Sequence, residues 1–229
     1  MFDLSPYDYQ AIFLSAKVAL IATLAALPFG FAAAALLTFG RFRGKMLLDG
    51  VLNLPLVLPP VVVGYLLLLL LGRDGWLGQL LAAAGVQVLF TWKAAVLASI
   101  IVGFPLLVRT IRIGLEGIDA HLLQASRTLG ASWWDTLLSV VLPLSGRAVA
   151  AGATLMFARS LGEFGATIIV AGNIPGVTQT IPLAIYDYSN APGGERAALV
   201  LCLVAVVLSL CALFLSDVVG RRLPRRSPQ

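Results

Sequence analysis

The stretch QASRTLGASWWDTLLSVVLPL, residues Gln124–Leu144, decides which fold and function this chain is expected to have. It is polar at its start and interrupts a sequence that is otherwise strongly apolar. Gly130 offers either a helix stop or a point of close approach, and Pro143 marks the expected entry to the next span. We therefore expect a short amphipathic helix outside the bilayer, whose partner is either lipid headgroups or another protein. The residues that can share one face of this helix are Leu122, Leu123, Ser126 and Leu129.

The composition around this stretch is that of a membrane protein. Of 229 residues, 59% are hydrophobic and 12% are charged, and the mean hydropathy is +0.95. Soluble domains are about 45 to 50% apolar and about 25% charged. The first residues carry no basic group, so they lack the positive region of a cleavable signal peptide, and the first apolar segment is expected to remain as a span. The sequence predicts an all-α membrane protein.

Five segments are apolar over the roughly 20 residues that a span needs. The stretch YDYQAIFLSAK before the first of them could lie in the membrane interface. We expect about five to six transmembrane helices in a single domain, residues 1–229. The candidate spans are Ala16–Phe39, Leu47–Leu71, Ala94–Ile113, Ala148–Ala171 and Ala197–Val219.

Basic residues orient these spans, because cytoplasmic loops collect Lys and Arg. Eleven basic residues fall on one set of segments and three, Arg73, Lys93 and Arg196, on the opposite set. This distribution places the C-terminus in the cytoplasm and the N-terminus in the periplasm, and it accounts for the net charge of +5 without a nucleic-acid partner. The eleven are Arg41, Arg43, Lys45, Arg109, Arg112, Arg127, Arg147, Arg221, Arg222, Arg225 and Arg226.

The sequence lacks the motifs of nucleotide binding, metal binding and nucleophilic catalysis. No G-x-x-x-x-G-K-[ST] motif occurs, so the chain has no P-loop of its own. His121 is the only histidine, which excludes a histidine-cluster metal site and disfavours a Ser-His or Cys-His pair. Cys202 and Cys211 are separated by about 13 Å of helix, too far for a disulfide. We expect neither an enzyme nor a metal protein.

The pattern Q-A-S-x3-G-x9-V-x-L-P resembles the E-A-A-x3-G-x9-I-x-L-P signature of the permease subunits of bacterial ABC importers. In that family the segment forms a coupling helix that docks on a cytoplasmic ATPase, and the resemblance implies such a role for residues 118–135. Gln124 replaces the acidic residue, so an ion pair at that position is not expected, although glutamine can still form hydrogen bonds. The residues carried over are Gln124, Ala125, Ser126, Leu129, Gly130, Leu142 and Pro143.

Two further blocks, LPLVLPPVVVGY and FARSLGEFGATIIVAGNIPGVTQTIPLAIY, resemble the molybdate importers within this family. The resemblance implies the transmembrane domain of a type I ABC importer in the bacterial inner membrane. It further implies a second copy of this chain, an ATPase subunit that binds ATP and Mg, and a periplasmic molybdate-binding protein. No cofactor is expected in this chain itself.

Two groups of residues are candidates for the translocation pathway, a gate or the dimer interface. Pro59 and Pro60 interrupt the second expected span, where a kink either lines a pore or serves packing alone. Arg159 and Glu163 lie near the middle of the fourth expected span, four residues apart, and can pair. Either Arg159 meets a divalent oxyanion or Glu163 helps to close a gate, or the two form a structural ion pair. The residues leave these alternatives open.

Rival functions also remain open. A tungstate, sulfate or thiosulfate permease would need a path for anions of the same shape and charge. A passive anion channel or a membrane scaffold would need no ATPase.

Overall fold

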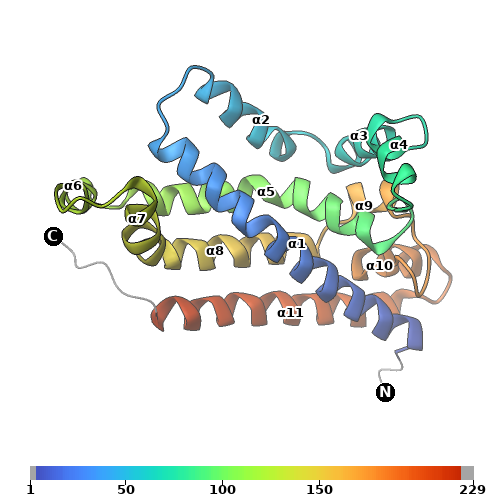
Figure 1. The fold of residues 1–229 in the computed structure, drawn as a ribbon. Helices are drawn as coiled ribbons and strands as arrows, with labels where there is room; N and C mark the ends of the chain where they lie inside the picture. The colour runs from blue at the N-terminus through green and yellow to red at the C-terminus, as the bar shows by residue number, and fades with distance from the viewer. Residues whose placement is uncertain (1–3, 223–229) are drawn as a thin grey trace.

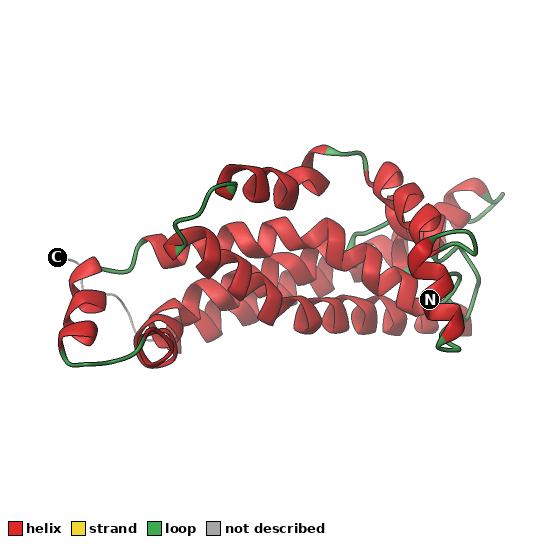
Figure 2. Ribbon diagram, turned by 45° about the horizontal axis from the view of Figure 1, so that its top comes forward, coloured by secondary structure: helices red, strands yellow, loops and turns green. Residues whose placement is uncertain are grey.

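The computed structural model describes residues 4–222 of the chain, without the side chains at positions 216, 217 and 219–222. The predicted cytoplasmic residues Arg225 and Arg226 lie outside this range. Long helices run side by side along one axis, with short helices at both ends (Figures 1 and 2). The helices are α1 (Pro6–Phe39), α2 (Lys45–Val57), α3 (Pro60–Leu71), α4 (Trp76–Ala83), α5 (Trp92–Glu116), α6 (Ala120–Thr128), α7 (Trp133–Thr136), the π-helical turn η1 (Leu137–Val141), α8 (Leu142–Leu161), α9 (Gly165–Val170), α10 (Ile181–Asn190) and α11 (Glu195–Arg222).

Helix α1 begins earlier than the expected first span. Ser5 and Asp8 form a capping box, in which the Ser5 backbone N–H donates to the Asp8 carboxylate at 2.7 Å and Pro6 occupies the first turn. The stretch YDYQAIFLSAK is therefore part of α1 and not a separate interfacial helix. The 34 residues extend about 51 Å, which exceeds the roughly 30 Å of bilayer hydrocarbon.

The second expected span is broken. Helices α2 and α3 are bent by 112° relative to each other, and Leu58 and Pro59 between them have extended ψ angles of 140° and 133°. Each of these two residues precedes a proline, which disfavours the helical conformation. Pro55 lies inside α2 without ending it. The prediction that this segment is not a straight rod is confirmed, and the break falls at Pro59 and Pro60.

The fourth expected span, Ala148–Ala171, was misplaced at both ends. A continuous helix of 29 residues begins at Trp133, passes through η1 and α8, and ends at Leu161. Pro143 lies in the first turn of α8, as expected for the entry to this span, but the helix itself already begins ten residues earlier at Trp133. The wider turn η1 comes directly before Pro143, in keeping with the missing N–H of proline. Among the described residues, four helices can span a membrane, or five if α2 and α3 count as one span.

Helix α5 is the centre of the bundle. Its Leu107, Ile111 and Leu115 are at most 1% exposed, and it packs against α1 and α8. A Cβ on Gly152 of α8 would lie 3.2 Å from the Leu107 side chain, so this glycine permits close packing of α8 on α5. Helix α11 packs against α8 and α10 at the edge of the bundle, and both of its cysteines are free and exposed.

Candidate coupling site and pathway residues

Helix α6 ends in a turn that requires glycine. The N–H of Ala131 donates to the carbonyl of Ser126 at 3.2 Å, and the N–H of Gly130 donates to that of Arg127 at 3.0 Å. These two bonds form a Schellman motif, and Gly130 has the positive φ of 85° that such a motif needs. The prediction of a helix stop at Gly130 is confirmed. At the other end, the Asp119 carboxylate caps α6 by accepting from the N–H of His121 at 2.8 Å.

A second cap begins α7 four residues after α6 ends. Ser132 and Asp135 form a capping box, and the Ser132 hydroxyl donates to the Asp135 carboxylate at 2.6 Å. The hydroxyls of Ser126 and Thr136 lie 2.9 Å apart, which joins α6 to α7, and Thr136 is fully buried. The S-x-x-D pattern was visible in the sequence but was not used. The helix caps and the hydrogen bond between Ser126 and Thr136 together make α6, the turn and α7 one ordered unit.

Trp133 connects this unit to the end of α1. Its ring lies edge-on to that of Phe39, with centroids 5.4 Å apart, and the guanidinium of Arg127 lies 5.6 Å from its centroid. In Figures 1 and 2, α6 lies beyond the long helices, at the end of the bundle where α1 and α5 terminate. The unit therefore lies where another protein can contact it without disturbing the packing of the bundle.

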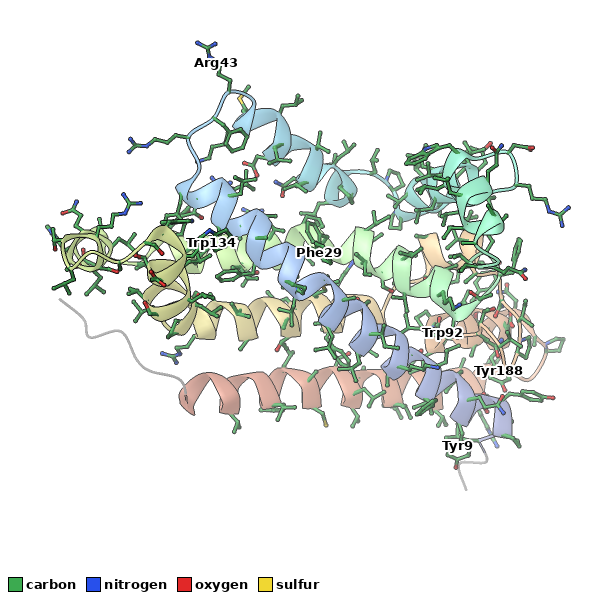
Figure 3. All side chains as sticks on the ribbon, viewed as in Figure 1. Tyr9, Phe29, Arg43, Trp92, Trp134 and Tyr188 are labelled. Carbon is green, nitrogen blue, oxygen red and sulfur yellow. The ribbon has the colours of Figure 1, made fainter. Side chains whose placement is uncertain are left out.

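The outer surface of this unit mixes polar residues with a few exposed apolar side chains. Leu129 is 88% exposed, and Gln124 and Ala125 are exposed beside it. The four residues expected on one face do not all point the same way, because Leu123 packs against the core and Ser126 bonds to Thr136. Apolar residues that the sequence did not indicate are also exposed in α7 and η1; they are Trp134, at 69% exposed and labelled in Figure 3, and Leu138. The predicted Leu142 and Pro143 are exposed as well.

Arg159 and Glu163 form an ion pair, but not within one helix. Nη1 of Arg159 lies 2.8 Å from Oε2 of Glu163, and α8 ends between them at Leu161. The other Glu163 oxygen accepts from the N–H of Ala166 at 2.9 Å, in the first turn of α9. Glu163 is buried, with 2% of its side chain exposed, whereas the Arg159 side chain is 31% exposed. Glu163 therefore orders the connection from α8 to α9, and Arg159 retains an accessible surface.

Pro59 and Pro60 lie beside this connection. A Cβ on Gly165 would lie 2.9 Å from the Pro60 side chain, and one on Gly64 would lie 2.8 Å from the backbone of Ala166. The start of α3 thus packs directly on α9. The structure brings the two groups of pathway candidates together, although they are about 100 residues apart in the chain.

Polar side chains join α1 to the segment that follows α9. The Tyr188 hydroxyl donates to the buried Asp8 carboxylate at 2.9 Å, and Ser15 accepts from the N–H of Ile181 at 2.7 Å. A hydrogen bond with Ser5 lowers the pKa of Tyr188, but burial and Asp8 outweigh it, so this pKa lies above its ordinary value. Figure 3 shows Tyr9, Trp92 and Tyr188 at this end, opposite Trp134. In the described part of the chain, no His, Cys, Asp and Glu side chains cluster as a metal site would require.

Comparison with known proteins identifies the family. Residues 26–225 match the model of the binding-protein-dependent transport system inner membrane component. This chain belongs to that family. It is 50% identical over 215 residues to the molybdenum transport system permease protein ModB of Escherichia coli K12, covering 93% of this chain and 94% of that protein. It is also 50% identical over 223 residues to ModB of Haemophilus influenzae, covering 97% of each. More distant relatives include the sulfate transport system permease protein CysW of Synechococcus elongatus, which is 39% identical over 197 residues, covering 85% of this chain and 69% of that protein.

Among solved structures, the fold matches a chain of the MetNI methionine ABC transporter, with a TM-score of 0.72 at 16% identity over 97% of this chain and all of that one. A chain of a bacterial alginate ABC transporter gives 0.77 at 15% identity, covering 97% and 82%. The fold is that of type I ABC importer transmembrane domains, and the chain is a multi-pass inner-membrane permease subunit.

Proposed function

We propose that this chain forms the transmembrane pathway of an ATP-driven molybdate importer. The observation that carries the proposal is the 50% identity, over nearly the whole chain, to permeases named for molybdenum transport. The sulfate permease CysW is less similar and is matched over less of its length. Tungstate, which has the same shape and charge as molybdate, is a second expected cargo.

The proposed importer contains two copies of this chain, two ATPase subunits that bind ATP and Mg, and a periplasmic molybdate-binding protein. The N-terminus is periplasmic and the C-terminus is cytoplasmic. Basic residues support this orientation, because Arg127 is part of α6, and the loop between α1 and α2 that contains Arg41 and Arg43 lies at the same end of the bundle. The segment 172–195, which includes α10, then lies on the periplasmic side and forms the docking surface and outer gate.

In this proposal the unit of α6, the Gly130 turn and α7 inserts into the ATPase. Its exposed Leu129 supplies apolar surface, and Gln124 offers hydrogen-bonding groups. The Schellman turn and the Ser126–Thr136 contact give the unit a fixed shape, so little ordering free energy is lost on docking. Movement of the ATPase pair is then transmitted to α8 directly through η1 and to α1 through Trp133 and Phe39.

Alternating access follows from this connection. ATP must bind the outward-open and inward-open states with different affinities, because a ligand shifts an equilibrium only by its differential affinity. The break at Pro59 and Pro60, packed on α9, is the proposed place where the pathway changes shape. Selectivity resides mainly in the binding protein, since a carrier must release its cargo.

Arg159 is proposed to face the pathway, where it meets the oxyanion, and Glu163 is proposed to hold Arg159 in place. The partial exposure of Arg159 beside the buried Glu163 supports this division of roles. Arg159→Ala is expected to lower uptake of molybdate in vesicles that contain the whole complex, while expression stays at the wild-type level. Wild-type uptake by this variant would remove Arg159 from the mechanism.

Reconstitution tests the function as a whole. The permease, its ATPase and its binding protein are placed in proteoliposomes, and uptake of radiolabelled molybdate is followed with and without ATP, in the presence of unlabelled sulfate. Uptake that needs ATP and resists excess sulfate is expected. Uptake without ATP would favour a passive channel, and uptake abolished by sulfate would favour a sulfate permease.

A further inference from the structure

A small polar cavity of about 250 Å³ lies between α2 and α5. Asp49 and Asn53 line it from α2, and Arg109 and Arg112 line it from α5, with apolar side chains completing the wall. No residue of α2 is buried, so α2 covers α5 loosely and leaves this space between them. The cavity shares no lining residue with the ion pair of Arg159 and Glu163.

The two arginines of the cavity differ in their partners. Arg112 lies 3.0 Å from the Asp49 carboxylate and 2.7 Å from that of Glu116, so its charge is compensated twice. The Asn53 amide also donates to the Asp49 carboxylate, at 2.9 Å. Arg109 is exposed and makes no hydrogen bond or ion pair with any described residue. The cavity therefore contains one guanidinium without a counter-ion, that of Arg109. The other guanidinium, that of Arg112, is already paired with Asp49.

The position of Arg109 in the membrane indicates whether its unpaired charge needs an anion. Arg109 follows Trp92, the first residue of α5, by 17 positions, or about 25 Å of helix. With Trp92 at the outer interface, Arg109 lies within the roughly 30 Å of hydrocarbon and not in the cytoplasmic loop where the sequence predicted it, and Arg112 lies at the inner boundary. A guanidinium at this depth is disfavoured against lipid and favoured in a wet cavity with an anion. The forked donors of arginine match a tetrahedral oxyanion.

We propose that this cavity is an exit site, where Arg109 and Arg112 hold the divalent oxyanion briefly before it enters the cytoplasm. Asp49 competes with the anion for Arg112 and keeps the affinity low, so that cargo is released. The volume is sufficient for one such anion with bound water. The inference rests on the proposed function, from which it takes the class of cargo.

Arginine labelling in the intact complex tests this site. The permease and its ATPase are placed in nanodiscs and treated with phenylglyoxal, and modification of Arg109 is measured by peptide mass spectrometry. Molybdate is compared with chloride at equal ionic strength. Molybdate at millimolar concentration is expected to slow modification of Arg109. Arg43, which is exposed in the loop before α2, is the internal control and should be modified at the same rate in both salts.

The variant Asp49→Asn sharpens the test, because it removes the competing carboxylate. The molybdate concentration for half-protection of Arg109 should fall about two- to fivefold, the range expected for loss of one partly exposed ion pair. Equal modification of Arg109 in molybdate and chloride would overturn the proposal, and so would an Arg109 that resists phenylglyoxal while Arg43 reacts. If protection is absent while uptake is normal, the exit site alone fails. If sulfate protects Arg109 while molybdate is not imported, the site stands and the proposed cargo fails.

Discussion

Replacing Gly130 by alanine strains the turn that gives the coupling unit its shape. Gly130 has a φ of 85°, and a Cβ at this position would meet nothing within 4 Å. The cost of Gly130→Ala is therefore conformational and not steric, about 1 to 2 kcal/mol for an L-residue in the left-handed region. The free variant can relieve this strain by unwinding the last turn of α6, whereas docking on the ATPase requires the turn to re-form.

The strain should then appear as weaker binding of the ATPase. A penalty of 1 to 2 kcal/mol raises the Kd by about 5- to 30-fold. The measurement is titration of purified ATPase onto the permease in nanodiscs, read by biolayer interferometry. Gly130→Asn should weaken binding less, because asparagine tolerates this conformation better than alanine.

Gly85→Ala is the matched control. Gly85 has a φ of 69° and equally open surroundings, but it lies between α4 and α5, away from the coupling unit. It should suffer similar strain and leave the Kd unchanged. Unchanged binding in Gly130→Ala would refute the claim that this turn shapes the docking surface. Equal weakening in both glycine variants would show a general effect on the fold instead.

Three further variants test the exposed Leu129, the packing of α3 on α9, and the ion pair of Arg159 and Glu163. Leu129→Asp should leave the thermal midpoint unchanged, because Leu129 is 88% exposed, but should weaken ATPase binding by a factor of about 30, as for a typical hot spot; normal binding would exclude Leu129 from the interface. Gly64→Ala should overpack the backbone of Ala166 at a cost of about 1 to 3 kcal/mol, lowering the midpoint by about 2 to 4 °C for each kcal/mol, and an unshifted midpoint would contradict the close packing of α3 on α9. Glu163→Gln should destabilise the chain by about 1 to 3 kcal/mol in chemical denaturation, and less in an Arg159→Gln background; additive effects of the two changes would mean that the ion pair contributes no coupling.

The sequence was most informative where a local pattern alone determines the backbone. Gly130 and the pair of prolines at 59 and 60 act through their own φ and ψ preferences, so the helix stop and the break in the second span could be predicted. The start of α1 could have been predicted in the same way from Ser5, Pro6 and Asp8.

The errors concern where a helix is prolonged or interrupted by a local exception to the regular pattern. Pro143 does lie in the first turn of α8, but η1 joins α8 to α7, so the helix already begins at Trp133, which the sequence did not indicate. Glu163 looked like part of a long helix, yet its carboxylate caps α9 after α8 has ended. The glycines at 162 and 165 on either side of Glu163 were the available signal for that interruption.

The exposed side of α6 also depended on the fold. Periodicity grouped Leu123 and Ser126 with Leu122 and Leu129, but only the last two remain exposed. Leu123 packs against the hydrophobic core, and Ser126 forms a hydrogen bond with Thr136, so neither is available to a partner. Sequence periodicity finds the amphipathic helix, and the neighbouring elements determine which part of its face is left for a partner.

Cross-linking from position 129 tests most directly whether α6 and its turn contact the ATPase and transmit its conformational change to this permease. The free cysteines Cys202 and Cys211 are first changed to alanine, and Leu129→Cys or Gly85→Cys is then introduced as the single thiol. With a short bifunctional cross-linker on the assembled complex, the thiol at position 129 is predicted to join the ATPase, with a yield that changes when ATP is bound. The thiol at position 85 is predicted to give no such product. Equal yields from both positions, or labelling of position 129 only from the periplasmic side, would contradict the account.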